Sequence, residues 1–422
     1  MNIKVLPGRI HGSVTVPGSK SVTQRYILLS AFMNKEVSIL NPSGCEDEVV
    51  ALSAAQRCGS AVLRNSEALK VLPDFRCPDV INGGESGTST RLLMGLLAGA
   101  GCRSILKISD ELKARPFDDL IDFLGKNSVH IEKTGDGYLI DATDRSFRYR
   151  QIRADRSSQF VSSALVYLAL GGMESFELTL QGPVVSSGYL DLTLSCLSRF
   201  GYAGTINGNT ISVSRAKEED SVEVVADGDF SSAAFWIVLS LFVSDGIFKL
   251  KGLNPGSSQP DSTIIDFLFK LGLEPEFDSE CLRLHSVDLP DSVLELDVDQ
   301  SPDLAPPISV LGLFSKRGIF LRNTGRLRLK ESDRISEICR LVESFGGKCD
   351  RTDNSIYIVA ENGIVNPGRL SFSDHRMIMS GIIAGIISGF EIVHENAERI
   401  AKSYPDFLNH LKSAGITIQV HE

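Results

Sequence analysis

Cations and hydroxyl groups gather where an apolar run begins. The stretch VPGSKSVTQR brings Lys20, Ser21 and Arg25 to the start of the run YILLSAF. A helix beginning here would add its unpaired backbone N–H groups and the positive end of its dipole to these side chains. Phosphates and carboxylates bind at such helix ends. We therefore expect this segment to bind an anion.

The same segment matches a nucleotide-binding P-loop only in part. The Walker A pattern requires GxxxxGK followed by Ser or Thr. In this chain Ser19 separates Gly18 from Lys20, and Gly12 lies too far upstream. The spacing therefore disfavours nucleotide binding of that kind.

Five further segments combine a small or polar start with an apolar run, and we call the polar start of each its head. The six segments read GSKSVTQRYILLSAF, ESGTSTRLLMGLLAGA, RSSQFVSSALVYLAL, GDFSSAAFWIVLSLF, SPDLAPPISVLGLF and SDHRMIMSGIIAGII. Their marker residues, spaced roughly seventy residues apart, are Lys20, Thr88, Ser158, Ser231, Asp303 and His375. This regular spacing predicts six repeated units.

The heads and nearby segments differ in their ionisable residues. The groups in question are Arg91 and Arg115, the SSQ of Ser157–Gln159, Asp303, the DHR of Asp374–Arg376, the basic and acidic run Arg328, Lys330, Glu331 and Arg334, and Lys402. Three of these groups have an ordinary alternative: SSQF could be a helix N-cap, KESDR a solvated i,i+3 charge pattern, and DHR a structural ion pair. Their common register with the repeat favours a shared site.

An amphipathic helix is expected after each head, and it should end at a glycine. The glycines are Gly59, Gly125, Gly201, Gly272, Gly346 and Gly415. Short β-rich segments such as VHIEKTG, SIYIVA and ITIQV follow. The first helix of each unit is apolar nearly all round, so it should be buried among sheets. Six mixed α/β units divide naturally into two domains of three.

Composition narrows the class of protein. The chain has 422 residues, 42% of them apolar and 23% charged, with a net charge of −10. This balance disfavours nucleic acid or an anionic membrane as the main partner. The apolar run MIMSGIIAGIISGF is too short to span a bilayer, and the N-terminus lacks a signal-peptide core. We expect a soluble, cytoplasmic protein that is a monomer by default.

Eight cysteines are scattered along the chain without a CxxC pair or a His/Cys cluster at metal-ligand spacing. In a chain of this length they are typical of reduced, mostly buried thiols in an intracellular protein. The sequence therefore predicts neither disulfides nor a metal site.

A series of motifs in fixed order resembles a known family. The motifs are PGSKSVTQR, SGTSTR, ARPFDDL, SSQF, PD, RLKESDR, DHRM and KSYPD, and they extend over the full length. With these the chain resembles the 5-enolpyruvylshikimate-3-phosphate synthases, which are enolpyruvyl transferases. The resemblance implies an α/β fold of two closing lobes, each with three βαβαββ units. The N-terminal lobe would be 19–227 and the C-terminal lobe 1–18 with 228–422, with hinges near 17–19 and 226–228.

The resemblance also implies a reaction. The family transfers the enolpyruvyl group of phosphoenolpyruvate to the 5-hydroxyl of shikimate 3-phosphate and releases phosphate, through a tetrahedral intermediate. This step leads toward chorismate and the aromatic amino acids. No cofactor and no metal are implied, because phosphoenolpyruvate is a co-substrate.

The resemblance assigns site residues position by position. Those implied for shikimate 3-phosphate are Lys20, Ser21, Arg25, Ser157, Ser158, Gln159, Ser186, Tyr189, Asp303 and Lys330. Those implied for phosphoenolpyruvate are Lys20, Gly87, Arg115, Gln159, Arg334, Arg376 and Lys402. Asp303 is the candidate base, Glu331 the candidate acid and Lys20 a second proton carrier. Opposite roles for two carboxyl groups require different environments.

Three positions depart from the family pattern. Glu85 stands where the family usually has Asn beside phosphoenolpyruvate, and Arg326 stands where many members have a neutral or acidic residue. Arg156 adds a cation before SSQ. These departures leave the reaction in place but put contacts and affinity at these positions in question.

Two alternative functions remain. The sister transferase that acts on UDP-N-acetylglucosamine typically has KN where this chain has Lys20 and Ser21, and it has a loop cysteine that DELKARPF lacks. A non-catalytic anion-sensing module would have lost the proton carriers, whereas Asp303 and Glu331 are both present. Both alternatives are therefore disfavoured.

Overall fold

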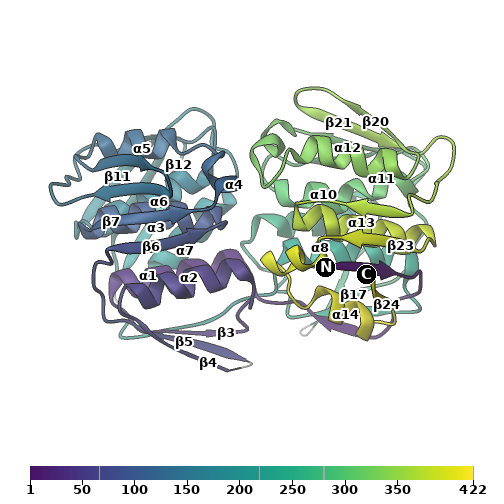
Figure 1. Cartoon of the computed structure of the whole chain (residues 1–422), viewed down its shortest axis with the longest axis horizontal. Coiled ribbons are helices and arrows are strands. Elements are labelled where there is room, and N and C mark those ends of the chain that lie inside the picture. Colours follow the sequence, from purple (N-terminus) through teal and green to yellow (C-terminus); the bar gives the residue numbers. More distant parts are fainter. Residues whose placement is uncertain (66, 218, 279–280, 422) are drawn as a thin grey trace. The chain divides into compact units, whose positions relative to one another are not determined.

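The computed structural model describes residues 1–65, 67–217, 219–278 and 281–421. The chain forms two compact units, Gly18–Ala226 and Met1–Pro17 with Asp227–Glu422 (Figure 1). The described residues form a mixed α/β fold with six four-stranded sheets. The α/β class expected from the repeat is confirmed.

Each sheet belongs to one βαβαββ repeat. Each sheet contains one parallel strand pair. In five sheets the other two strands form an antiparallel hairpin, and in the sixth β1 pairs antiparallel with both β23 and β24. A parallel pair needs a crossover connection. The helix that begins at a head provides it for the pairs β6–β7, β10–β11, β18–β19 and β22–β23, whereas β14–β3 and β2–β15 join strands from distant parts of the chain. For the first four pairs, the position of the head at the start of the helix follows directly from this topology.

The Gly18–Ala226 unit contains three repeats. The first has α1 (Lys20–Met33), β3 (Val37–Leu40), α2 (Glu46–Arg57), β4 (Ala61–Arg64), β5 (Ala68–Leu72) and, late in the chain, β14 (Val222–Val225). The second has β6 (Val80–Gly84), α3 (Gly87–Ala100), β7 (Arg103–Ile108), α4 (Asp110–Lys113), α5 (Asp118–Gly125), β8 (His130–Thr134) and β9 (Gly137–Asp141). The third has β10 (Gln151–Arg153), α6 (Ser158–Ala169), β11 (Ser175–Gln181), α7 (Gly188–Arg199), β12 (Tyr202–Asn207) and β13 (Thr210–Arg215).

The other unit also contains three repeats. The first has β2 (Ser13–Thr15), α8 (Phe230–Val243), β15 (Phe248–Lys251), the 3₁₀ turn η1 (Pro260–Ser262), α9 (Thr263–Lys270), β16 (Glu276–Phe277) and β17 (Cys281–Leu284). The second has β18 (Leu294–Asp297), η2 (Pro302–Leu304), α10 (Ala305–Ser309), α11 (Leu311–Phe314), β19 (Ile319–Arg322), η3 (Gly325–Leu329), α12 (Arg334–Ser344), β20 (Lys348–Arg351) and β21 (Ser355–Val359). The third has β22 (Arg369–Ser371), α13 (His375–Ser388), β23 (Ile392–Glu395), η4 (Ala397–Lys402), α14 (Phe407–Ser413), β24 (Ile418–His421) and β1 (Asn2–Val5).

Strands distant in sequence complete three of the sheets. β14 pairs in parallel with β3, while β2 pairs in parallel with β15. β1 lies between β23 and β24. Each unit thus closes its sheets with strands from both ends of its sequence.

The first helix of each repeat lies in the core, as its all-round apolar sequence predicts. α3, α6, α8 and α13 are buried along nearly their whole lengths. The fifth apolar run is not one helix, because it is divided into η2, α10 and α11. Pro306 and Pro307 stand at its start, and proline cannot donate the backbone bonds of a continuous helix.

Five of the six expected helix-ending glycines adopt a left-handed backbone. Gly59, Gly201, Gly272, Gly346 and Gly415 have φ between 76° and 106°. Gly125 differs, because it is the last residue of α5 and the left-handed residue is Ser128, at φ 62°. The second helix of each repeat therefore ends at or near a glycine, as expected. After α5, however, the left-handed turn lies at Ser128 and not at Gly125.

The prediction that all cysteines are reduced is wrong for four of them. Cys77 is bonded to Cys102 and Cys339 to Cys349, each pair with its Cα atoms 5.3 Å apart. The partners lie on adjacent elements of one repeat, such as α12 and β20. That proximity comes from the fold and cannot be read from the cysteine spacing. The remaining cysteines are free and buried, as expected.

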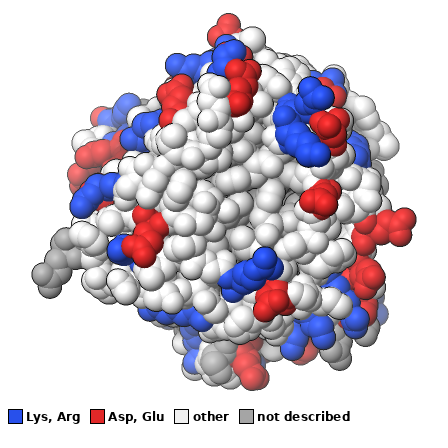
Figure 2. Space-filling view, turned by 90° about the vertical axis from the view of Figure 1, so that its right-hand side faces the viewer, with Lys and Arg blue, Asp and Glu red and all other residues white. Residues whose placement is uncertain are grey.

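Charged residues of opposite sign lie near one another on the surface. On the face shown in Figure 2, Lys and Arg lie beside Asp and Glu around a largely uncharged middle. Cross-strand ion pairs such as Arg322–Glu295, at 2.8 Å, show the same balance. Within the described residues, none of the helices combines the length and apolar character needed to traverse a bilayer.

Candidate active site

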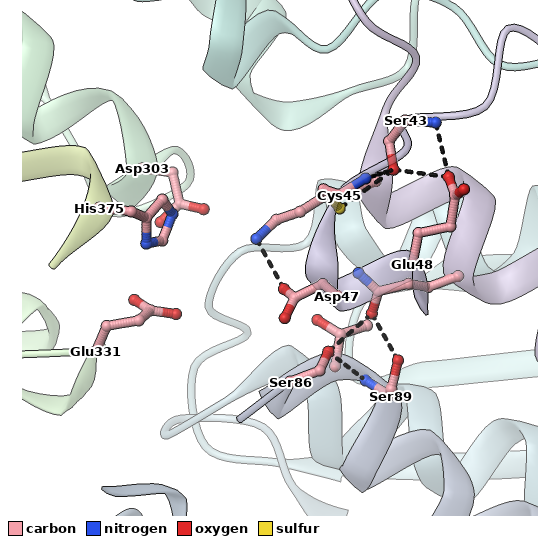
Figure 3. A network of polar contacts seen from close by, with 12 residues as sticks. Ser43, Cys45, Asp47, Glu48, Ser86, Ser89, Asp303, Glu331 and His375 are labelled. Carbon is pink, nitrogen blue, oxygen red and sulfur yellow. Dashed lines mark hydrogen bonds and ion pairs between the residues drawn. The ribbon is translucent and has the colours of Figure 1, made fainter. Parts of the chain in front are cut away.

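Side-chain hydrogen bonds join three helix N-termini in the Gly18–Ala226 unit. Ser86, the N-cap of α3, and Ser89 both donate to Oε1 of Gln24 on α1, at 3.1 and 2.8 Å (Figure 3). Gln159 on α6 donates to the hydroxyl of Thr88 on α3, at 2.9 Å. The first three heads of the chain therefore lie together.

Lys20 is the first residue of α1 and contacts the start of α2. Its Nζ lies 3.0 Å from Oδ2 of Asp47, with the two side chains 12% and 9% exposed (Figure 3). Next to Asp47, the fully buried carboxylate of Glu48 accepts from the backbone N–H and the hydroxyl of Ser43, both at 2.7 Å. Asp47 thus holds the ammonium group from the start of α2, which the hydrogen bonds between Glu48 and Ser43 hold in place.

Asp47 did not emerge from the sequence as a site residue. The only signal is the acidic run EDE at the start of α2, and acidic residues are ordinary at helix N-termini.

Arg25 lies deeper on the same helix and is 1% exposed. It donates to the hydroxyl of Thr193 on α7 at 2.9 Å and to the carbonyl of Ser21 at 2.7 Å. Burial lowers the pKa of Arg25 from its ordinary value. Since both partners are neutral oxygens, an anion could balance its charge. Thr193 also donates to the carbonyl of Tyr189, and nearby Ser186 has a φ of 49°.

Gly87 allows two guanidinium groups to approach the start of α3. A Cβ atom at this position would lie 3.1 Å from NH1 of both Arg91 and Arg115. Arg91 lies over the rings of Phe117 and Phe160 and donates to Oε1 of Gln159. The absence of a side chain at Gly87 therefore leaves the helix N-terminus and its cations open to a ligand.

The SSQF motif forms a helix N-cap, one of the alternatives that the sequence leaves open. Ser157 precedes α6, and its hydroxyl accepts from the backbone N–H of Gln159 at 3.3 Å. Ser158 is the first helical residue and is 6% exposed. An N-cap hydroxyl can also contact an anion, so this structural role leaves the binding role open.

In the other unit, a fully buried arginine joins three carboxylates. Arg334, the first residue of α12, donates to Asp374 at 2.8 Å, Asp303 at 2.7 Å and Glu331 at 2.6 Å. The Glu331–Arg334 pair has the i,i+3 spacing expected for KESDR, but it is not a solvated pair because Arg334 has no exposed surface. Burial lowers the pKa of Arg334, but Asp374, Glu331 and Asp303 together raise it well above its ordinary value.

Asp303 also contacts cations from two other segments. Its carboxylate lies 2.9 Å from NH2 of Arg376 and 3.7 Å from Nζ of Lys330. Burial alone would raise the pKa of Asp303, but Arg376, Lys330 and Arg334 lower it well below its ordinary value. In this state Asp303 is ionised and only weakly basic.

Lys330 and Arg376 respond differently to the same surroundings. Burial lowers the pKa of Lys330 to about 8, although Asp303 opposes the shift. Burial lowers the pKa of Arg376, but Asp303, Glu331 and Asp374 together raise it above its ordinary value. Arg376 also contacts the ring of His375 at 2.9 Å. Lys330 can therefore exchange a proton near neutral pH, whereas both arginines stay charged.

The DHR motif combines a structural ion pair with the site. Asp374 caps α13 by accepting from the backbone N–H of Arg376 at 2.9 Å, and its other oxygen accepts from Arg334. Lys402 is the last residue of η4, which packs against α13.

The three departures from the family pattern lie at identifiable places. Glu85 is exposed and immediately precedes the N-cap of α3. Arg326 lies 3.8 Å from Asp299, and Arg156 lies 3.6 Å from Asp119. Two of the three departures thus contact carboxylates of their own unit.

Each unit thus presents cations at helix N-termini, and the second also presents carboxyl groups able to move protons. Anion binding with acid–base chemistry is what this arrangement can do.

Comparisons with known proteins agree with this chemistry. A 3-phosphoshikimate 1-carboxyvinyltransferase of Picrophilus torridus is 40% identical, with 99% of this chain and 100% of that protein covered. One of Thermoplasma volcanium is 39% identical, with 95% of each chain covered. The solved structure of EPSP synthase from Acinetobacter baumannii matches with a TM-score of 0.79 at 24% identity, covering 100% of both chains, and supports the fold. The family model described as EPSP synthase (3-phosphoshikimate 1-carboxyvinyltransferase) matches residues 6–411. The chain therefore belongs to the EPSP synthase family.

Proposed function

We propose that the two clusters described above carry out the reaction of the EPSP synthase family in this chain. As a 3-phosphoshikimate 1-carboxyvinyltransferase, the chain transfers the enolpyruvyl group of phosphoenolpyruvate to shikimate 3-phosphate in the shikimate pathway. The main support for these roles is the cluster in which the guanidinium groups of Arg334 and Arg376 pair with the carboxylate of Asp303.

The Gly18–Ala226 unit supplies most contacts to shikimate 3-phosphate in this proposal. Ser157, Ser158 and Ser186 bind its phosphate, and Arg25 balances its charge. Support comes from the start of α6, where two hydroxyls meet the helix N-terminus, and from the neutral partners of Arg25. The remaining contacts come from Lys20, Ser21, Gln159, Tyr189, Asp303 and Lys330.

Arginine forks and lysines bind phosphoenolpyruvate in this proposal. The residues are Lys20, Gly87, Arg115, Gln159, Arg334, Arg376 and Lys402. A guanidinium can hold a carboxylate or phosphate through two parallel hydrogen bonds, which an ammonium group cannot do. The open space at Gly87 beside Arg115 supports this assignment.

Binding of phosphoenolpyruvate would activate Asp303. Without a ligand, Arg334 and Arg376 compensate the carboxylate and keep it weakly basic. When an anionic substrate draws these cations to itself, the pKa of Asp303 rises. Asp303 then takes the proton of the 5-hydroxyl, whose oxygen attacks the central carbon of phosphoenolpyruvate.

Proton transfers balance over the two halves of the reaction. In the addition, Glu331 protonates the methylene carbon while Asp303 receives the hydroxyl proton, and a tetrahedral intermediate forms. In the elimination, Glu331 takes a proton back from the methyl group and Asp303 protonates the departing phosphate. Lys20 is the second proton carrier. The cations of both clusters stabilise the anionic intermediate.

A phosphate-release assay tests this proposal. We expect turnover with phosphoenolpyruvate plus shikimate 3-phosphate, no release when either is omitted, and a loss of at least a hundredfold in Asp303→Asn. Turnover with UDP-N-acetylglucosamine in place of shikimate 3-phosphate would favour the sister transferase. Near-normal turnover of Asp303→Asn would remove Asp303 from the role of base.

A further inference from the structure

A buried acid that the proposed mechanism does not use lies next to the Asp303 cluster. Asp261 belongs to η1, and its segment is tied to two heads. Gln259 donates to the carbonyl of Gly228 at 2.9 Å and accepts from the backbone N–H of Phe230 at 3.1 Å. On the other side, Ser301 donates to the carbonyl of Pro260 at 2.6 Å. These bonds fix Asp261 between the start of α8 and the turn that contains Asp303.

The carboxylate of Asp261 is only half satisfied. The residue is 2% exposed, and one oxygen accepts from the hydroxyl of Ser231 on α8. The other oxygen, Oδ1, is buried and has no hydrogen-bond partner among the described residues. A buried acceptor without a hydrogen bond destabilises a fold, and a charged one does so more strongly, so such a group calls for an explanation.

The charges that face Asp261 come from three elements. They are Asp303 of η2, Asp229 at the N-cap of α8 and Arg376 of α13. Burial and the charge of Asp303 raise the pKa of Asp261 to about 7, while Ser231 and Arg376 oppose the shift and Asp229 adds to it. Electrostatic coupling is mutual, so an ionised Asp261 must also raise the proton affinity of Asp303.

We infer that Asp261 is a positioning residue for the reaction, whose buried negative charge offsets the cations around Asp303 and keeps Asp303 able to accept a proton. The inference rests on the proposed role of Asp303 as the base. It explains why a carboxylate with an unsatisfied oxygen is kept beside a cluster that already holds three carboxyl groups.

The charge of Asp261 makes the activity depend on pH in a definite direction. Above a pH of about 7 Asp261 is ionised and supports the basicity of Asp303. Below this pH Asp261 is protonated, the repulsion is lost, and Asp303 becomes a weaker base. The turnover number, kcat, should therefore have an acid limb, falling as the pH drops through the pKa of Asp261.

The substitution Asp261→Asn tests this dependence, because Asn resembles the protonated acid in size. We expect kcat at pH 8 to fall about tenfold, in line with one unit of lost proton affinity at Asp303. The acid limb of kcat between pH 6 and 8 should flatten. Asp266→Asn is the matched control, since Asp266 lies exposed on the following helix α9. Its pH profile should match that of the unchanged protein.

A second variant keeps the acid and changes only its hydrogen bond. Ser231→Ala removes the donor that lowers the pKa of Asp261. The acid limb should then move to higher pH, with kcat nearly restored at pH 9. A merely structural role of Asp261 would not predict this shift.

Two sets of results would overturn the inference. One is a pH profile that stays unchanged in both variants while Asp303→Asn is inactive, which would leave the base assignment standing. The other is equal loss of activity at every pH in Asp261→Asn, together with a lower unfolding midpoint. Activity retained by Asp303→Asn would instead refute the proposed function.

Discussion

Replacement of Arg334 by Met should destabilise one unit of the protein much more than an ordinary surface substitution. Arg334 has no exposed side-chain surface, and its three donor nitrogens contact Asp374, Asp303 and Glu331. Met has a similar length but no charge, so the substitution removes the cation and leaves the carboxylates in place.

The expected loss of unfolding free energy depends on which partners each carboxylate keeps after Arg334 is removed. Asp303 keeps Arg376 at 2.9 Å, and Glu331 is 20% exposed and can be hydrated. Asp374 has no exposed side-chain surface and loses its charged partner, keeping the backbone N–H of Arg376. Removal of one partner from a buried ion pair typically destabilises by about 3–5 kcal/mol. We expect a loss near the lower end, about 3 kcal/mol.

The fluorescence of Trp236 can report the unfolding of this unit alone. Trp236 is the single tryptophan of the sequence, and it lies in the core of the unit that contains Arg334. Its indole N–H donates to Tyr404 at 3.0 Å, and its ring stacks on Phe248. Denaturant titrations followed by this signal avoid the assumption that both units unfold together.

Acidification gives the prediction a second test. In Arg334→Met, protonation relieves the uncompensated carboxylates, so the difference in unfolding free energy from the unchanged protein should shrink between pH 8 and pH 5. Arg317→Met is the control, because Arg317 pairs with Asp291 at 2.9 Å on the surface, with both side chains more than half exposed. It should show no measurable change. A loss below about 1 kcal/mol in Arg334→Met, or one independent of pH, would refute the reasoning.

Two further predictions concern the other unit. Lys20→Ala should lower kcat at least a hundredfold without changing the circular dichroism spectrum, since Lys20 lies at a helix start. Loss of its pair with Asp47 should lower the unfolding midpoint only modestly; near-normal kcat would exclude it from the site. Glu85→Asn should lower the KM for phosphoenolpyruvate several-fold at low salt and less at high salt, because it removes an exposed negative charge before α3. An unchanged KM at low salt would mean that the charge of Glu85 does not affect the binding of phosphoenolpyruvate.

The sequence by itself determined the repeated architecture. Apolar helices and helix-ending glycines are local patterns, because side-chain periodicity and left-handed turns depend on residues a few positions apart. The head residues Lys20, Ser158 and His375 were therefore placed correctly at the starts of α1, α6 and α13. The broken fifth helix shows the limit of this reasoning, since apolar character alone overlooked two adjacent prolines.

Tertiary structure decided which charges meet. Lys20 contacts Asp47, Arg334 contacts Asp374 at a separation of 40 residues, and Arg25 contacts Thr193 at a separation of 168. No local pattern encodes such pairs, because they arise only when separate elements pack, within one repeat for Lys20 and Asp47 and between repeats for the other two pairs.

The disulfide partners and the contacts of Asp261 also depend on tertiary packing. Cys339 and Cys349 become partners only through the packing of α12 on β20, and Asp261 reaches the charge of Asp303 only because η1 is bonded to two heads. The sequence thus determined which residues could bind anions and move protons. The packing of the repeats decided which carboxylate lies beside which cation, and electrostatic interactions depend on that distance and on burial.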